Sequence, residues 1–477
     1  VEKELDPHRE RFEKKDYKLT EDCMKKAGEL GLLGISVPAE YGGMGMPFNT
    51  SVLICDRISG ANGSFSTAFG AHTGIGTLPI LLYGDDAQRT KYLPKLASGE
   101  WMGCYCLTEP GAGSDANSGK TKAVLIDDGK NYLITGQKMW ISNAGFADVL
   151  IVFARIEDDK NITGFILEKG MEGITLGEEE QKLGLNSSST RQVFFNDVKV
   201  PVENLLGGRG NGFKIAMNAL NVGRIKLSAA VLDACRRVIG LSTNYSNERI
   251  QFGIPIAKFG AIKHKLADMA VRTYAIESAT YRAGSEIEKN ILRLESEGVD
   301  HQQAHLKGIE EYAIECSIVK VLGSETIQFC SDEGIQIYGG MGYSADAPME
   351  AAYRDARIAR IYEGTNEINR MLLVGMILKK AMKGELDIMG PAMKVAEGLM
   401  SIPSFDKPDN SVLFEVEKEQ IKKLKKAILM CAGKAAQHFA MTIEREQEVL
   451  MNLADMVIEV YTAESAILRA EKLATKN

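Results

Sequence analysis

The sequence predicts a multi-domain α+β protein in which helices come first, strands follow and helices return. Three observations predict this order. The stretch "EDCMKKAGELGLLG" near the N-terminus carries apolar residues at helical spacing and ends in glycine. The stretch "KAVLIDDGKNYLITGQ" has two β-rich runs around an Asp-Asp-Gly turn, which is typical of a hairpin. After Gly212, segments such as "GFKIAMNALNVGRIKLSAAVLDACRRVIGL" carry long apolar stripes at helical spacing.

These patterns divide the chain into five predicted parts. The middle strand candidates, "DVLIVFARI", "NITGFILEK" and "TRQVFFNDVKVP", do not alternate with helices, so we expect a compact antiparallel β domain rather than a doubly wound sheet. Gly, Pro, Ser and Asp gather in "MGPAMK" and "SIPSFDKPDNS", which predicts a linker. The parts are an N-terminal helical domain (1–103), a middle β domain (104–211), a C-terminal helical bundle (212–383), the linker (384–411) and a helical C-terminal extension (412–477).

Composition excludes several classes of protein. The chain has 477 residues, of which 45% are apolar and 25% charged, and this mixture is typical of a globular protein. A net charge of −7 argues against a nucleic-acid-binding protein. Eight cysteines without a CxxC pair make no disulfide framework, so we expect a reducing compartment and no secretion. The charged start lacks the apolar core of a signal peptide, and no apolar run reaches the ~20 residues of a membrane span.

Two glycine-rich loops are candidate cofactor sites. "YCLTEPGAGSDANSG", from Tyr105 to Gly119, opens like a strand and then breaks into a loop whose N–H groups and hydroxyls suit a flavin or a phosphate. A plain surface loop explains the same residues equally well. Neither this loop nor "GGRGNG" at 207–212 is a GxGxxG fingerprint within a βαβ unit, so a Rossmann NAD site is disfavoured.

Aromatic and glycine motifs leave further alternatives open. Trp140 in "QKMWISNAG" fits either a core tryptophan or an aromatic wall for a planar cofactor. Arg249 and Phe252 in "ERIQFG" fit either a solvated helix end or contacts to a phosphate and a base. Gly339 and Gly340 allow a ligand to approach the backbone closely.

His301 and His305 have the i, i+4 spacing of a helical metal site. Their surroundings, "SEGVDHQQAHLKG", are polar and lack a carboxylate at the HExxH position, so we expect an exposed helix face instead. "KEQIKKLKKAILMCAGKAAQHF" is basic and amphipathic, and a packed helix is favoured over a membrane-surface helix.

The stretch "RIYEGTNEINR" holds two glutamates, Glu363 and Glu367. Glu367 lies inside the predicted helix that Thr365 or Asn366 caps, which is a favourable place for a helix-end carboxylate. Glu363 precedes that helix at a turn that Gly364 loosens, where a side chain can point into a cleft. Spacing alone does not choose between them as a catalytic base.

Taken together, the motifs resemble the acyl-CoA dehydrogenase family. "CLTEPGAGSD", "QKMWISN", "KLGLNSSSTRQVFFNDVKVP", "ERIQFG" and "QIYGGMGY…RIYEGTNEI" occur in family order over residues 15–383. The helical extension resembles that of the very-long-chain branch. The resemblance implies a C-terminal four-helix bundle, a homodimer that completes each FAD site, and electron-transfer flavoprotein as the electron acceptor. It also implies dehydrogenation of a fatty acyl-CoA to a trans-2-enoyl-CoA, in the cytoplasm of a bacterium or the mitochondrion of a eukaryote, and a possible membrane contact through the extension.

The resemblance also implies roles for individual residues. Glu363 matches the base that removes the α-proton, whose pKa burial should raise. The residues implied to bind FAD are Tyr105, Leu107, Thr108, Ser114, Trp140, Ser142, Arg249, Phe252, Gln336, Gly339, Gly340 and Thr365. Those implied to bind substrate are Ser114, Arg224, Glu363 and Gly364.

Three features bear on how far the resemblance extends. Some family branches carry the base directly before the arginine that Arg224 matches, but this chain has Gly223 there, which leaves Glu363. Lys263 replaces a glutamine that touches FAD in many members. The small residues of segment 70–76 leave room for a long acyl chain. A flavin oxidase and a non-catalytic scaffold protein are the alternatives to a dehydrogenase.

Overall fold

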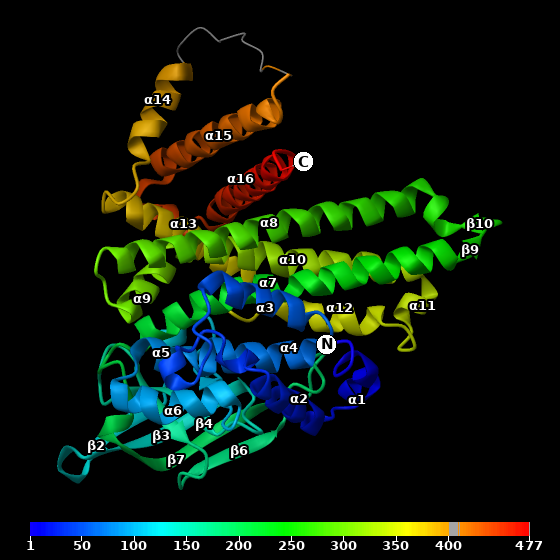
Figure 1. Cartoon of the computed structure of the whole chain (residues 1–477). Coiled ribbons are helices and arrows are strands. Elements are labelled where there is room, and N and C mark those ends of the chain that lie inside the picture. Colours follow the sequence, from blue (N-terminus) through cyan, green and yellow to red (C-terminus); the bar gives the residue numbers. More distant parts are fainter. Residues whose placement is uncertain (400–408, 410, 477) are drawn as a thin grey trace.

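A computed structural model of the chain describes residues 1–399, 409 and 411–476. The protein forms successive layers: a β-sheet, the N-terminal helices, a bundle of long helices and a C-terminal helical extension (Figure 1). The predicted fold class is confirmed. Among the described residues, no helix has both the length and the apolar character that crossing a membrane requires.

The N-terminal part is helical and packs between the sheet and the bundle. Its α6 begins with a capping box, in which the Asp85 side chain accepts from the Gln88 N–H and the Gln88 side chain accepts from the Asp85 N–H. A π-helical turn, Ala71–Gly76, follows α4 directly. The helices are α1 (Arg9–Glu13), α2 (Tyr17–Glu29), α3 (Phe48–Ser59), α4 (Gly63–Gly70), α5 (Leu78–Tyr83) and α6 (Asp86–Ser98).

The middle part is a sheet of eight strands in which β6-β7-β3-β2-β4-β5-β8 are neighbours and β1 pairs with β4. The expected antiparallel domain is only partly antiparallel, because β1 and the first two residues of β2 pair in parallel with β4. The strands are β1 (Gly103–Cys106), β2 (Lys122–Ile126), β3 (Asn131–Ser142), β4 (Val149–Ile156), β5 (Thr163–Glu168), β6 (Ile174–Glu179), β7 (Thr190–Pro201) and β8 (Leu205–Leu206).

The bundle is built on two 37-residue helices, α7 and α8. Buried residues of α7 such as Ile225, Ala229 and Leu232 form one core with α3, α4 and α8. A hairpin of β9 (Ile250–Gln251) and β10 (Ile254–Pro255) joins these helices at the end of an arm that projects from the molecule (Figure 1). The bundle helices are α7 (Gly212–Glu248), α8 (Gly260–Ser296), α9 (His301–Glu311), α10 (Ala313–Tyr338), α11 (Gly340–Tyr343), α12 (Met349–Arg357) and α13 (Asn366–Met382).

The extension consists of α15 (Glu415–Phe439) and α16 (Gln447–Ala474). Leu450, Ala454 and Ile458 of α16 pack against Leu373 of α13, so the extension is joined to the bundle by an apolar core. The predicted linker contains a helix, α14 (Met389–Leu399), and its residues 400–408 and 410 lie outside the described residues. Pro391 lies in the first turn of α14, where proline is tolerated.

Candidate active site

A cavity of about 480 Å³ lies where the N-terminal helices meet the bundle. Its wall includes Gly70 and Gly74 from the N-terminal part, Ser142 at the end of β3, and Gly223 from α7. Glu363 completes the wall from the turn before α13. The cavity therefore joins segments that are far apart in the sequence.

The turn at Glu363 has an unusual backbone that aims its side chain. Glu363 has φ 60° and Gly364 has φ 82°, two successive left-handed residues. A left-handed conformation is uncommon for glutamate and costs about 1–3 kcal/mol, and such outliers are often found at active sites. Thr365 then caps α13 by accepting a hydrogen bond from the Ile368 N–H at 3.2 Å.

Gly223 lies next to the carboxylate of Glu363 in the wall of the cavity. A Cβ atom at position 223 would lie 2.5 Å from Glu363 Oε2, which is closer than Cβ atoms in proteins approach other atoms. A larger residue at position 223 would therefore displace the carboxylate. The glycine that pointed to Glu363 in the sequence is the residue that makes space for it.

Two buried cations lie near Glu363, but both bind the backbone of the turn. Arg224 donates to the Glu363 carbonyl at 3.2 Å and to Asn221 Oδ1 at 2.8 Å. Lys320 Nζ donates to the Gly364 carbonyl at 2.6 Å and to Asn366 Oδ1 at 2.8 Å. The carboxylate itself stays unpaired, since Glu363 Oε2 is buried and has no hydrogen-bond partner within the described part of the chain.

This arrangement gives Glu363 a near-neutral pKa. Burial raises the pKa of Glu363 to about 7, against the opposing attraction of Arg224 and Lys320. Burial likewise lowers the pKa of Lys320 to about 7. Glu367, by contrast, is exposed, and the hydrogen bond from its own backbone N–H lowers its pKa. The two glutamates of the motif are thus distinct, with Glu363 alone in the cavity wall.

The structure also identifies supporting residues that the sequence did not single out. The Asn369 side chain donates to the carbonyls of Glu363, Gly364 and Thr365 at 3.3, 2.8 and 3.0 Å. Lys320 lies on the apolar helix α10. A single lysine within the apolar stretch "CSIVKVLG" is the sequence feature that could have indicated a buried lysine there. Asn369 carried no such signal, because its role depends on the folded turn.

A second buried lysine, Lys226, lines the cavity and was also missed. It lies on α7, and burial lowers the pKa of its amine. No hydrogen bond or ion pair of Lys226 is found among the described residues. Cys55 opposes this effect of burial and raises the pKa of Lys226.

The β-sheet brings several predicted cofactor residues together. Met139 N–H donates to the Thr108 carbonyl at 2.9 Å, and buried Lys138 donates to the Leu107 carbonyl at 3.2 Å. The loop after β1 therefore lies beside Trp140. Trp140 has φ 60° and is 53% exposed, which rules out the core-tryptophan interpretation.

The other predicted residues of this region differ in burial. Tyr105 is buried, its hydroxyl has no partner in the described chain, and burial and then the charge of Glu363 raise its pKa. Ser114 is exposed on the loop, and Ser142 lines the cavity. Arg224 lies behind the turn and does not line the cavity, so its contact with substrate stays a prediction.

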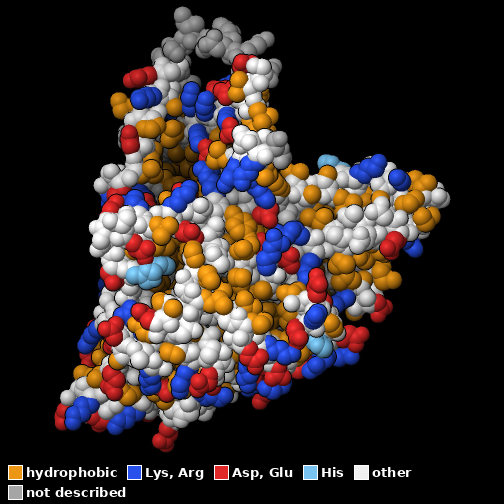
Figure 2. Space-filling view, viewed as in Figure 1, with side chains coloured by type: hydrophobic (Ala, Val, Ile, Leu, Met, Phe, Trp, Pro, Cys, Tyr) orange, Lys and Arg blue, Asp and Glu red, His pale blue; other side chains and the backbone are white. Residues whose placement is uncertain are grey.

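A second group of predicted residues lies on the arm near its hairpin or beside the arm at the junction of α10 and α11. Phe252 is 95% exposed, and hydrophobic side chains are visible there in Figure 2. Arg249, Gln336, Gly339 and Gly340 are exposed as well, and none of them lines the cavity. Within one chain, these residues and Glu363 do not form one site. Lys263, which replaces the family glutamine, is exposed too.

Comparisons with known proteins match the whole chain. Family models of acyl-CoA dehydrogenase match residues 1–100 (N-terminal domain), 104–198 (middle domain), 210–378 (C-terminal domain) and 423–477 (a further C-terminal domain). A probable acyl-CoA dehydrogenase of Bacillus subtilis (strain 168) is 48% identical over 472 residues, which are 99% of this chain and 79% of the relative. The mitochondrial very long-chain specific acyl-CoA dehydrogenase of Rattus norvegicus is 35% identical over 95% of this chain and 70% of its own. The crystal structure of acyl-CoA dehydrogenase complexed with FAD from Bacillus anthracis has a TM-score of 0.94 and 46% identity, and covers 99% of this chain and 80% of its own.

Proposed function

Because this chain belongs to the acyl-CoA dehydrogenase family, we propose that it oxidises a fatty acyl-CoA thioester to the trans-2-enoyl-CoA, with Glu363 as the base. One observation carries the proposal. Glu363 presents an unpaired buried carboxylate to the cavity of about 480 Å³, and its pKa is raised to about 7. A base with a pKa near the working pH is the most effective for proton abstraction.

Each neighbour of Glu363 has a role in that step. The α-proton of a thioester is weakly acidic, so the base must be fixed and shielded from water. Arg224, Lys320 and Asn369 fix the backbone of the turn without neutralising the carboxylate. The Glu363 N–H makes no hydrogen bond within the described chain, so it is free to donate to the thioester oxygen as negative charge develops.

The residues around Trp140 fit FAD. Its half-exposed indole, next to the loop of Leu107 and Thr108, offers an aromatic wall of the kind that a flavin ring needs. We propose that Tyr105, Ser114, Ser142 and Thr365 line the same flavin. FAD held there would supply the acceptor for the hydride from the β-carbon, and electron-transfer flavoprotein is the proposed acceptor of the electrons.

We propose a long-chain substrate and a homodimer. A Cβ atom at Gly70 or Gly74 would meet no atom within 4 Å, so both glycines leave free space along the cavity wall. The dimer accounts for the exposed arm, where Arg249, Phe252, Gln336, Gly339 and Gly340 would contact the FAD of the second subunit. Similarity to Bacillus proteins supports a bacterial cytoplasmic location over a mitochondrial one.

An anaerobic titration tests the reaction and its chain length together. Purified protein receives C4, C8 and C16 acyl-CoAs while its flavin absorbance is recorded. We expect bleaching that is strongest with C16, and reduction of electron-transfer flavoprotein in a coupled assay. Absence of bound flavin would contradict the proposed function, and a sharp C4 optimum would contradict only the long-chain substrate. Peroxide formation in air without an acceptor would indicate an oxidase.

A further inference from the structure

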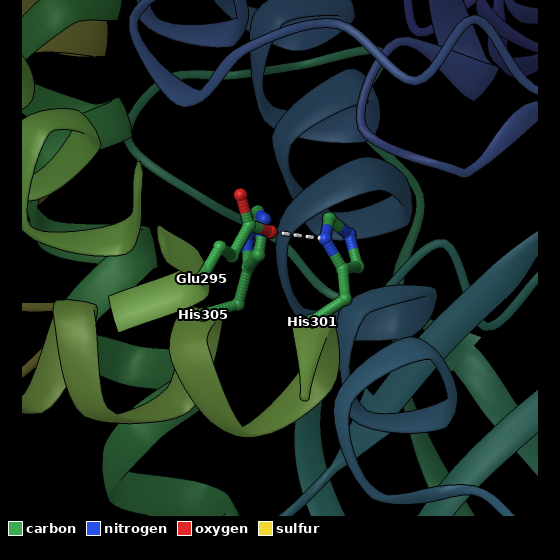
Figure 3. A group of neighbouring side chains, drawn as sticks. All are labelled: Glu295, His301 and His305. Atoms are coloured by element: carbon green, nitrogen blue, oxygen red, sulfur yellow. Dashed lines mark hydrogen bonds and ion pairs between the residues drawn. The ribbon is translucent and has the colours of Figure 1, made fainter. Parts of the chain in front are cut away.

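Three potential metal ligands meet at the junction of α8 and α9, and none of them lines the cavity. His301 and His305 lie one helical turn apart on α9, with their ring centroids 4.4 Å apart. Glu295 comes from the last turn of α8, and its Oε1 lies 2.5 Å from His301 Nδ1 (Figure 3). One ligand atom from each residue lies within 4.8 Å of the other two.

The sequence did not predict this group, because the carboxylate comes from another helix. The HExxH pattern seeks a glutamate on the helix of the histidines. Here the chain reverses direction between Ser296 and His301, so the histidines of α9 come to lie beside Glu295 in the last turn of α8. His305 is half-buried rather than on the exposed face that we expected.

We propose that Glu295, His301 and His305 bind a divalent transition metal ion of the zinc type. Imidazole nitrogens with one carboxylate are a common ligand set for such ions, and a water molecule would occupy a fourth position. Bound zinc needs ligands at about 2.0–2.1 Å, so the three side chains must draw together on binding. The surface position of His301, whose side chain is 62% exposed, permits that adjustment and leaves an entry path.

The local charges also favour a cation. Glu295 has no lysine or arginine partner among the described residues, and its one ion pair is with His301. His305 makes no hydrogen bond in the described chain, so its ring nitrogens are not engaged by another residue there.

The bound ion would stabilise a corner of the fold rather than take part in catalysis. None of the three ligands lines the cavity. The adjacent Gln302 side chain donates to the Leu82 carbonyl at 2.6 Å, which joins the start of α9 to α5. A metal ion would crosslink α8 to α9 at this point, so binding should raise the thermal stability of the protein and leave turnover unchanged.

Titration of the full-length holoenzyme with Zn²⁺ against a chelating indicator tests the proposal. All variants carry Cys431→Ser, because Cys431 is the exposed cysteine of the described chain and would compete for zinc. We expect one site, weakened at least tenfold by Glu295→Gln or His305→Gln. His264→Gln, an exposed histidine on α8, is the matched control and should bind as tightly as the parent. With Co²⁺ as a probe, the parent should show an absorption spectrum of low-symmetry coordination that His305→Gln lacks.

Equal zinc affinity in the parent and in Glu295→Gln and His305→Gln would overturn the proposal, as would the absence of stoichiometric binding to the parent. Zinc should also raise the melting temperature of the parent and not that of His305→Gln. Acyl-CoA turnover should be the same in all these proteins, so this test is independent of the proposed function.

Discussion

The turn at Glu363 and the end of the arm differ in how many contacts a single chain provides around their predicted functional residues. At the turn, Arg224, Lys320 and Asn369 all bind the backbone around Glu363, and the carboxylate faces the cavity. At the arm, Phe252 is 95% exposed and does not line the cavity that Glu363 faces. The difference shows that one chain already holds the side chain of Glu363 in place, and the exposed arm is what the proposed homodimer would cover.

The largest loss of turnover should come from removing the carboxylate of Glu363. We expect Glu363→Gln to keep FAD and to lose about 10³-fold in turnover, because a general base contributes about 10²–10⁴-fold. Stopped-flow reduction of the flavin by acyl-CoA measures the loss. Glu367→Gln is the matched control, and its turnover should stay near that of the parent. Retained turnover in Glu363→Gln would refute the assignment.

The second effect tests the space that Gly223 leaves for the carboxylate. Gly223→Ala would place a methyl group 2.5 Å from the present position of Oε2 and displace the base. A displacement of about 1 Å can cost about 10²-fold in rate, which is the loss we expect in kcat. Gly240→Ala is the control, because Gly240 lies on the same helix with no atom within 4 Å of an added Cβ. Equal turnover in both variants would show that Gly223 does not position the base.

The third effect concerns the arm. Phe252→Ser should weaken dimerisation and FAD retention together, by about 2 kcal/mol or thirtyfold, as for an aromatic residue central to an interface. Sedimentation velocity and the ratio of flavin to protein measure both quantities. Val271→Ser, an exposed apolar residue of α8 away from the arm's tip, serves as the control. A monomeric parent protein that retains FAD would contradict the predicted role of the arm.

The same two regions show what a sequence does and does not reveal. Glu363, Gly223 and the loop at Trp140 lie in long local motifs, so they were predicted before the fold was known. Lys320 and Asn369 act on a turn that forms only when α10 and α13 pack together, and no local pattern encodes that contact. Glu295 joins His301 and His305 for the same reason. The parallel pairing of β1 with β4 also depends on strands that are separated by a hairpin.

The smallest effect is a pH dependence, and it separates two carboxylates of the cavity. The pKa of Glu363 is raised to about 7, so the base is protonated below that pH and active above it. We expect kcat/KM to rise about tenfold between pH 6 and pH 8 and then to level off, as for one group that must lose a proton. Lys320 and Asp355 also have pKa values of about 7, and Asp355 lines the same cavity.

Asp355→Asn distinguishes the two carboxylates. Asp355 accepts a hydrogen bond from the Leu185 N–H at 2.6 Å, and asparagine can still accept it, so the fold should be kept. If Glu363 is the titrating base, Asp355→Asn retains the rise near pH 7. A pH-independent kcat/KM in Asp355→Asn would assign the rise to Asp355 instead. Lys320→Met tests the remaining group: loss of the nearby cation should move the midpoint to higher pH, because Lys320 lowers the pKa of Glu363.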